Sequence, residues 1–201
     1  MGHRRPALCG NVIKVCQILE FLSQSGQRRG SRERDTDMRI IIGADHAGFA
    51  LKGPIVNALR EWGHEVEDVG THGPEPIDFP VVARRVCGPV RAGDYDRGVM
   101  VCGTGIGACM AANKIPGIRA ALCHDVYSAH QSVEHDDANI ICLGAQIVGD
   151  QLAYDLLRAY LAAEMSTEEH FQRRVRMLAD MEREAAKEIR IRVDFGRASD
   201  D

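Results

Sequence analysis

Residues 100–114 read MVCGTGIGACMAANK, and this stretch sets the expected fold. An apolar run ends in Cys102, glycines then alternate through Gly103, Gly105 and Gly107, and residues compatible with a helix follow. A short, continuous apolar run that stops at a glycine is typical of a strand buried on both faces. The stretch therefore predicts a strand, a tight loop and a helix, which together form the repeating unit of parallel α/β sheets.

The same alternation continues on both sides of this stretch. Strand-like apolar runs are expected at residues 39–44, 65–69, 98–102, 119–123 and 139–143, and helices at 49–62, 80–92, 106–114, 126–135, 150–163 and 167–190. The alternation predicts an α/β fold with a doubly wound, Rossmann-like, five-stranded parallel sheet, helices on both faces and a long C-terminal helix. In such sheets ligands bind beyond the carboxyl ends of the strands.

The composition limits the function classes. The chain has 201 residues, of which 45% are hydrophobic and 27% charged, with a formal net charge of −4 and a pI of about 6.1. These values are typical of a globular protein and argue against nucleic acid or a membrane as partner. No apolar run approaches the ~18 residues that a membrane span needs. Seven cysteines with no Cys-x-x-Cys pair are expected to be mostly reduced core residues, which favours a cytoplasmic protein.

The first 37 residues differ from the rest of the chain. A short helical periodicity is followed by a run rich in Ser, Gly, Gln and Arg, a composition typical of flexible linkers. Charged Glu20 and the lack of a clean cleavage site argue against a secretory signal. We expect residues 1–37 to be a disordered leader or an over-extended start, residues 38–190 to form the folded domain, and residues 191–201 to be a tail.

The glycine loop does not match two familiar phosphate-binding patterns. A Walker loop needs Lys and then Ser or Thr after its last glycine, whereas Ala108 and Cys109 follow Gly107. A dinucleotide fingerprint belongs on the first strand, and this loop follows the third. Alternating glycines let backbone amides approach a ligand, so the loop is predicted to hold a developing oxyanion. A tight turn around a buried thiol is the alternative.

Polar side chains follow the predicted strands at the edge where a ligand would bind. Cys102 ends the third strand, and Asp45 and His46 follow the first. A thiol among loop amides at a helix N-terminus is expected to have a pKa below its usual value of roughly 8.5, so that the thiolate can act as base or nucleophile. The local sequence places no histidine beside Cys102 for nucleophilic work, although the fold could bring one from elsewhere.

A third polar cluster precedes the fifth predicted strand, where His135 stands between Glu134 and Asp136. Acids beside an imidazole fix its orientation and favour its protonated form, which suits a proton shuttle. A metal site made by His124, His130 and His135 is disfavoured, because spacings of six and five residues do not share one helical face.

Five motifs stand in one order at sensible spacings. They are GADHAGF at 43–49, CGTGIG at 102–107, AANK at 111–114, GIRA at 117–120 and HDDAN at 135–139. With these motifs the chain resembles, over residues 38–188, the type B ribose-5-phosphate isomerases, relatives of the allose- and galactose-6-phosphate isomerases. The resemblance implies an aldose–ketose isomerase that acts on a sugar phosphate without metal or cofactor. It also implies a homodimer or tetramer with active sites at the subunit interface.

The resemblance assigns the chemistry to the glycine loop. Cys102 would be the base that moves a proton between C1 and C2 of the sugar. Thr104 and the amides of Gly103, Gly105 and Gly107 would stabilise the cis-enediolate oxygen that this proton transfer creates.

The resemblance assigns substrate binding to other segments. His135, contributed by the partner subunit, would assist opening of the furanose ring. Asp45 would hold the ring-opening hydroxyls, and His46 would lie near the phosphate. The remaining substrate-binding positions are Asp136, His170 and Arg174.

The chain departs from the family pattern at several positions. Phe79 stands where many members have tyrosine, Gln146 where arginine is common, and His170 in a run that usually supplies arginine. Asp136 replaces a frequent asparagine. Because glutamine and histidine cannot copy the bidentate contact of arginine with phosphate, these departures leave the substrate open. Ribose 5-phosphate is expected first. An erythrose or erythrulose, allose or galactose phosphate is the alternative, as is a non-catalytic sugar-phosphate-binding module.

Overall fold

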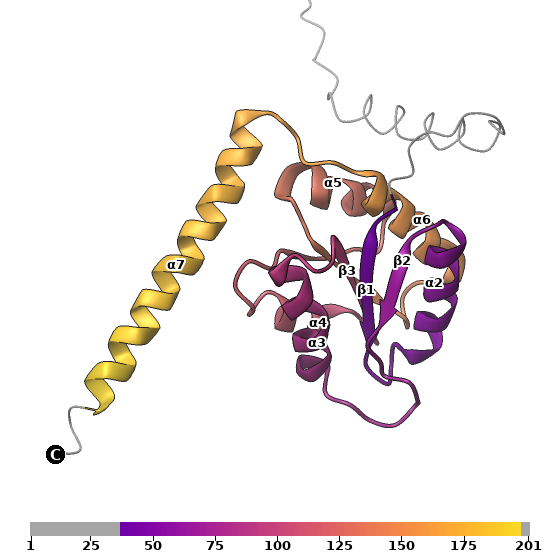
Figure 1. Ribbon diagram of the computed structural model, residues 1–201, viewed down its shortest axis with the longest axis horizontal. Helices are drawn as coiled ribbons and strands as arrows, with labels where there is room; N and C mark the ends of the chain where they lie inside the picture. The colour runs from indigo at the N-terminus through magenta and orange to yellow at the C-terminus, as the bar shows by residue number, and fades with distance from the viewer. Residues whose placement is uncertain (1–36, 198–201) are drawn as a thin grey trace, which may run out of the picture. The chain divides into compact units, whose positions relative to one another are not determined.

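The computed structural model describes residues 37–197 (Figure 1). Within this range five strands and six helices alternate in the order β1 (Arg39–Ala44), α2 (Phe49–Glu61), β2 (Glu65–Asp68), α3 (Phe79–Ala92), β3 (Arg97–Cys102), α4 (Ile106–Ala112), β4 (Ala120–Leu122), α5 (Val126–Asp136), β5 (Ile140–Gly144), α6 (Asp150–Ala162) and α7 (Glu169–Arg197). The leader expected at residues 1–37 lies outside the described residues except for Asp37, and so do the last four residues of the tail.

All strand pairs of the sheet are parallel, and the strand order is β2-β1-β3-β5-β4. The predicted doubly wound α/β sheet is therefore confirmed. The chain moves outward from β1 to β2 and then returns to place β3 on the other side of β1. The strand order thus reverses between β1 and β3, and a doubly wound sheet has its ligand crevice at such a point.

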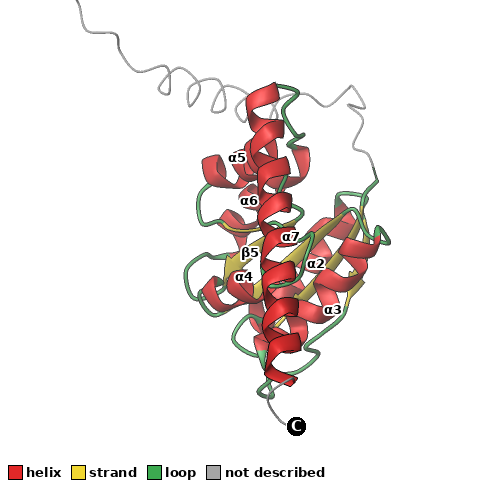
Figure 2. Cartoon of the chain, turned by 90° about the vertical axis from the view of Figure 1, so that its left-hand side faces the viewer, coloured by secondary structure: helices red, strands yellow, loops and turns green. Residues whose placement is uncertain are grey.

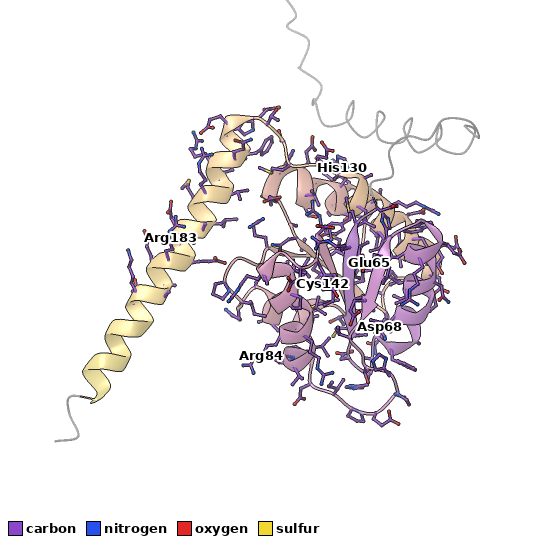
Figure 3. The ribbon with its side chains drawn as sticks, viewed as in Figure 1. Glu65, Asp68, Arg84, His130, Cys142 and Arg183 are labelled. Carbon is purple, nitrogen blue, oxygen red and sulfur yellow. The ribbon has the colours of Figure 1, made fainter. Side chains whose placement is uncertain are left out.

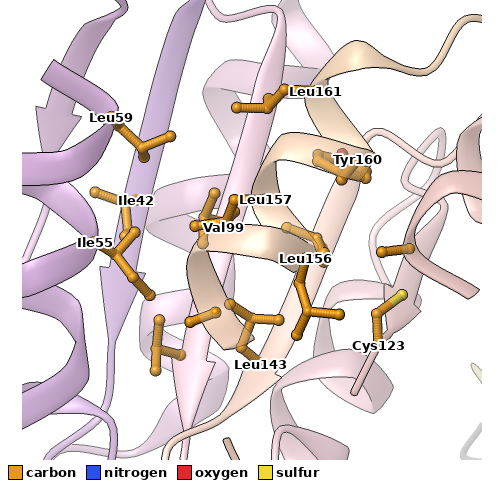
Figure 4. Close-up of a cluster of buried hydrophobic side chains, with 14 of the residues drawn as sticks. Ile42, Ile55, Leu59, Val99, Cys123, Leu143, Leu156, Leu157, Tyr160 and Leu161 are labelled. Carbon is orange, nitrogen blue, oxygen red and sulfur yellow. The ribbon is translucent and has the colours of Figure 1, made fainter. Parts of the chain in front are cut away.

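Two apolar cores lie on the two faces of the sheet. On one face, side chains of α2, α5 and α6 cover alternate residues of the strands. This core includes Ile42, Val99 and Leu143 from the strands, and Ile55, Leu59, Leu156 and Tyr160 from the helices (Figure 4). On the other face, α3 and α4 cover Ile41, Met100 and Ile140. Figure 2 shows the strands in yellow between the red helices. Because both faces are covered, the inner strands β1, β3 and β5 are continuous apolar runs. The edge strand β2 reads EVED and is not the apolar run expected at residues 65–69.

The cysteines of the described residues are all free, and Cys87, Cys123 and Cys142 are buried. This confirms, for that part of the chain, the prediction of reduced core thiols. Cys9 and Cys16 lie outside the described residues. In residues 37–197 no helix combines the length and apolarity needed to cross a membrane.

Local sequence explains where the helices begin and end. The Asp125 carboxylate accepts the Ser128 N–H at 2.7 Å and so caps the N-terminus of α5. Pro80 lies in the first turn of α3, where its missing N–H costs nothing, and Gly93 ends that helix with φ 83°. Helix α7 continues to Arg197 instead of ending at the predicted residue 190, because neither glycine nor proline follows until Gly196.

Candidate active site

Asp45 and Cys102 lie beside each other where the strand order reverses. Asp45 follows β1 and donates its backbone N–H to the Val101 carbonyl at 3.2 Å, while Cys102 is the last residue of β3. The Asp45 carboxylate is 5% exposed; it accepts the Gly48 N–H at 2.9 Å and the hydrogen bond of the Cys102 thiol. A Cβ on Gly48 would lie 2.3 Å from the Val101 oxygen, so only glycine allows this loop to pack on β3.

The Cys102 loop, residues 102–107, is held by its own turn and by the end of β5. Gly105 has φ 77° and precedes α4, and a Cβ there would come within 3.0 Å of the Leu143 carbonyl carbon. The Ala145 N–H binds the Cys102 carbonyl at 2.8 Å, and the Gln146 N–H binds the Gly103 carbonyl at 2.9 Å. The loop conformation is therefore fixed before any ligand arrives, which is what a preorganised oxyanion site requires.

The structure contradicts the expected pKa of Cys102. Burial and the hydrogen bond and negative charge of Asp45 raise the pKa of this thiol above its ordinary value, whereas the amides of Gly105 and Gly103 lower it by less. The sequence indicated the amides, but it did not indicate the carboxylate that folding brings to the sulfur. In the ligand-free protein Cys102 is thus a thiol at neutral pH.

Other predicted site residues lie at the same edge of the sheet. His46 is exposed and its Nδ1 accepts the Ile77 N–H at 3.4 Å, which ties the β1 loop to the segment before α3. The Thr104 hydroxyl is exposed and accepts the Ile106 N–H at 3.4 Å. At Gly107 a Cβ would lie 3.1 Å from the Phe79 ring, so this aromatic side chain covers the end of the Cys102 loop.

The remaining predicted residues lie at the opposite end of the sheet. His135 and Asp136 end α5, which leads to the first residue of β5, whereas the last residue of β5 pairs with Cys102. A strand of this length spans about 15 Å, so the structure does not bring His135 to Cys102 within one chain. In Figure 1 the strands point down while α5 lies at the top, and in Figure 3 Asp68 and His130 mark these two ends.

Three of these residues gather around one aromatic ring at the start of α7. His135 stacks on Phe171 with ring centroids 3.8 Å apart and planes 17° apart, and His170 lies 3.9 Å from the same ring. The Arg174 guanidinium carbon is 5.7 Å from the ring centroid. We call these four residues the His135 cluster. Asp136 is exposed and lines a separate cavity of about 360 Å³ between α5 and α7.

Two further polar side chains lie at the Cys102 edge and were not predicted as site residues. The ring of His124 accepts the Gly144 N–H through Nε2 at 3.1 Å. The Gln146 carboxamide lies beside Gly103, and a Cβ added to Gly103 would be 3.3 Å from its oxygen. His124 comes two residues after the end of β4, and Gln146 two residues after the end of β5; that position was the signal that could have identified them.

In residues 37–197 no three His, Cys, Asp or Glu side chains come together in a way that could hold a metal ion.

Comparison with known proteins identifies the family. The sequence model described as Ribose/Galactose Isomerase matches residues 40–178. The chain is 44% identical to ribose-5-phosphate isomerase B of Escherichia coli over 135 residues, which cover 67% of this chain and 91% of the relative. It is 43% identical to D-erythrulose-4-phosphate isomerase of Pectobacterium atrosepticum over 129 residues, 63% of this chain and 84% of that one.

The fold agrees with this result. The solved structure of Clostridium thermocellum ribose-5-phosphate isomerase B superposes with a TM-score of 0.72 at 44% identity, covering 74% of this chain and 99% of the other. Because the family model matches more than half of the chain and the relatives are matched over most of their length, the chain belongs to the ribose/galactose isomerase family.

Proposed function

We propose that this member of the family interconverts ribose 5-phosphate and ribulose 5-phosphate through a cis-enediolate, with Cys102 as the base. The observation that carries the proposal is the position of the Cys102 thiol, between the Asp45 carboxylate and the loop amides at the carboxyl end of β3. The E. coli relative and the C. thermocellum structure are both named ribose-5-phosphate isomerase B, which supports this substrate.

The Cys102 loop offers what the reaction needs. Removal of a proton from a carbon next to a carbonyl requires a base and preorganised donors for the oxygen that becomes negative. Thr104 supplies a hydroxyl, and Gly103, Gly105 and Gly107 supply backbone amides to this region. A single donor of this kind typically contributes about 3 kcal/mol to lowering the barrier.

Substrate binding would also favour loss of the Cys102 proton to water, which can reach this half-buried thiol, and so convert it to the thiolate. Asp45 raises the thiol pKa in part by accepting its hydrogen bond. A sugar hydroxyl that donates to Asp45 takes the place of the thiol and removes this contribution. The amides of Gly105 and Gly103 lower the Cys102 pKa, and the hydrogen bond to Asp45 then no longer opposes their effect. In this account Asp45 binds the substrate and controls the base with the same carboxylate.

The active site would be completed by a second copy of the chain. The Cys102 loop and the His135 cluster lie at opposite ends of one sheet. A single chain would therefore give its Cys102 loop to one site and its His135 cluster to another. In a homodimer the His135 cluster of one subunit faces the Cys102 loop of the other. His135 then assists ring opening, while Asp136, His170 and Arg174 bind the substrate together with His46.

A second candidate substrate is erythrulose 4-phosphate. One relative that is 43% identical is named D-erythrulose-4-phosphate isomerase, so this level of identity does not separate the two substrates. Gln146 and His170 stand where many family members carry arginine, and they change the polar groups available to the sugar and its phosphate. The enediolate chemistry at Cys102 would be the same for both sugars.

The test is a coupled aldose–ketose assay with ribose, erythrose, allose and galactose phosphates. Ribose 5-phosphate is expected to give the highest kcat/KM. Cys102→Ala is expected to lower kcat about a thousandfold without a change in folding, because a general base contributes on this scale. Cys109→Ser is the matched control, since this thiol lies one turn into α4 and outside the proposed chemistry.

Two results would contradict the proposal. A wild-type protein that is inert on all four sugar phosphates would leave a binding module as the remaining function. A Cys102→Ala protein with the turnover of the Cys109→Ser control would exclude Cys102 as the base.

A further inference from the structure

Phe171 joins the first turn of α7 to the end of α5. Its ring stacks on His135 at 3.8 Å, and this pair is one of several contacts between the two segments. The Ser166 N–H binds the Glu134 carbonyl at 2.9 Å, so the segment before α7 is fixed to α5 next to His135. The side chain of Gln172 donates to the Ser166 carbonyl at 3.4 Å. These hydrogen bonds of Ser166 and Gln172 fix the chain before and after Phe171, and so hold its ring in place.

The same ring also lies beside His170 and Arg174, which bind the phosphate in the proposed site. His170 lies at 3.9 Å with its plane tilted by 41°, and the Arg174 guanidinium approaches to 5.7 Å. The negative face of an aromatic ring attracts cations and protonated imidazoles, and it also limits the rotamers of side chains that pack on it. One neutral side chain thus sets the relative positions of two imidazoles and one guanidinium.

A carboxylate lies beside each of the two imidazoles. Glu134 Oε2 is 3.5 Å from His135 Nε2, and Glu168 Oε2 is 3.4 Å from His170 Nδ1. Each imidazole is therefore placed by an acid through a ring nitrogen and by Phe171 through its ring face. A fixed imidazole transfers a proton more effectively than one that rotates, because catalytic groups must be held near their reactive geometry.

We propose that Phe171 is a positioning residue of the active site, which orients His135 and holds His170 and Arg174 as one phosphate-binding group. The proposal rests on the proposed function, since it gives the His135 cluster its role in that reaction. Phe171 does not touch the reacting atoms of the sugar. It acts through the three residues that surround it, and its contribution is to assemble them before substrate binds.

The test compares Phe171→Leu, which removes the ring but keeps an apolar side chain, with Phe171→Tyr, which keeps the ring. Met177→Leu is the matched control, as an exposed apolar residue on the same helix. Two measurements that need no turnover are made on the full-length protein. One is the NMR shift of the His135 ring protons, assigned by its loss in His135→Asn. The other is the dissociation constant for inorganic phosphate.

The wild-type His135 ring protons are expected upfield, because they lie over the Phe171 ring. Phe171→Leu is expected to lose this shift and to bind inorganic phosphate about tenfold more weakly, which corresponds to one lost cation–π arrangement. Phe171→Tyr and Met177→Leu are expected to keep both properties. The KM for ribose 5-phosphate should rise in Phe171→Leu by a similar factor.

Two outcomes would overturn the positioning role. In one, Phe171→Leu keeps the upfield shift. In the other, it loses the shift but binds phosphate as tightly as the wild type, so that the ring has only a structural effect. These readouts do not depend on catalysis. A wild type that is inert on every sugar phosphate would contradict the proposed function, while the phosphate measurement would still decide the role of Phe171.

Discussion

Among single residues, the contact between the Asp45 carboxylate and the Cys102 thiol matters most, because it sets the charge of the proposed base. Burial and Asp45 raise the Cys102 pKa, so the thiolate fraction is small at neutral pH and grows as the pH rises toward and above the ordinary thiol value. An enzyme that keeps its base protonated until substrate arrives avoids an exposed, oxidisable thiolate in the free state.

Replacement of Asp45 by Asn is predicted to lower the Cys102 pKa, because the substitution removes the negative charge and allows the side chain to donate to the sulfur. The pH profile of Cys102 alkylation by iodoacetamide, followed by peptide mass spectrometry across a pH series, should shift toward lower pH. An alkylation profile that coincides with that of the wild type would mean that Asp45 does not control the sulfur.

Cys109 behaves in the opposite way. A hydrogen bond with Cys142 and contacts from Asn113 lower its pKa to about 7, and the Asn113 amide nitrogen is 3.5 Å from its sulfur. We predict that iodoacetamide at pH 7.5 modifies Cys109 before Cys102 in the ligand-free protein, as measured by the time course of labelled peptides. Faster labelling of Cys102 would contradict this order. Inactivation by alkylation should therefore be measured in a Cys109→Ser background.

At the scale of elements, one ion pair connects helix α2 to the end of strand β2. The Lys52 ammonium, 3% exposed, contacts both oxygens of Asp68, which is 24% exposed. Asp68 also accepts the Gly70 N–H at 2.9 Å, and the Gly70 carbonyl accepts the Ala44 N–H at 2.7 Å. The pair thus supports the backbone next to Asp45, on the side away from Cys102.

Lys52→Met is predicted to reduce the free energy of unfolding by about 2 kcal/mol, because it leaves the Asp68 carboxylate half-buried without its cation. Urea denaturation followed by circular dichroism gives the measurement. Lys187→Met is the matched control, since Lys187 is exposed on α7. A loss no larger than that of the control would mean that water replaces the ammonium without cost.

The elements could be predicted from the sequence because their signals are local. The apolar run that ends at Cys102 and the glycines after it lie in one short segment, and the structure confirms a strand, a loop and a helix there. The Cys102 pKa could not be predicted in the same way, because Asp45 meets the sulfur only when β1 and β3 pair. The stacking of Phe171 on His135 likewise depends on how α7 leaves α6 and approaches α5.

In the whole molecule, the proposed reaction requires the Cys102 loop and the His135 cluster to come together in one site. Apolar side chains in the Cys102 loop and just after it are exposed, with Ile106 at 52% and Met110 at 63%. Leu178 and Met181 are exposed on α7, downstream of the His135 cluster. Burial of such surfaces against a second copy would remove apolar area from water and unite the halves. The separation of Cys102 from His135 within one sheet is what makes this arrangement necessary for the proposed reaction.

Subunit complementation tests this arrangement directly. Cys102→Ala and His135→Asn proteins are each expected to be nearly inactive on ribose 5-phosphate. If every site takes Cys102 from one subunit and His135 from the other, a mixed dimer contains one doubly altered site and one intact site. Random exchange of equal amounts should therefore restore about a quarter of the wild-type activity. Mixing either variant with a Cys102→Ala/His135→Asn double variant is the control, and it should restore none. A 1:1 mixture that exchanges subunits, shown by mass spectrometry, yet stays as inactive as its components would mean that both residues serve a site within one chain.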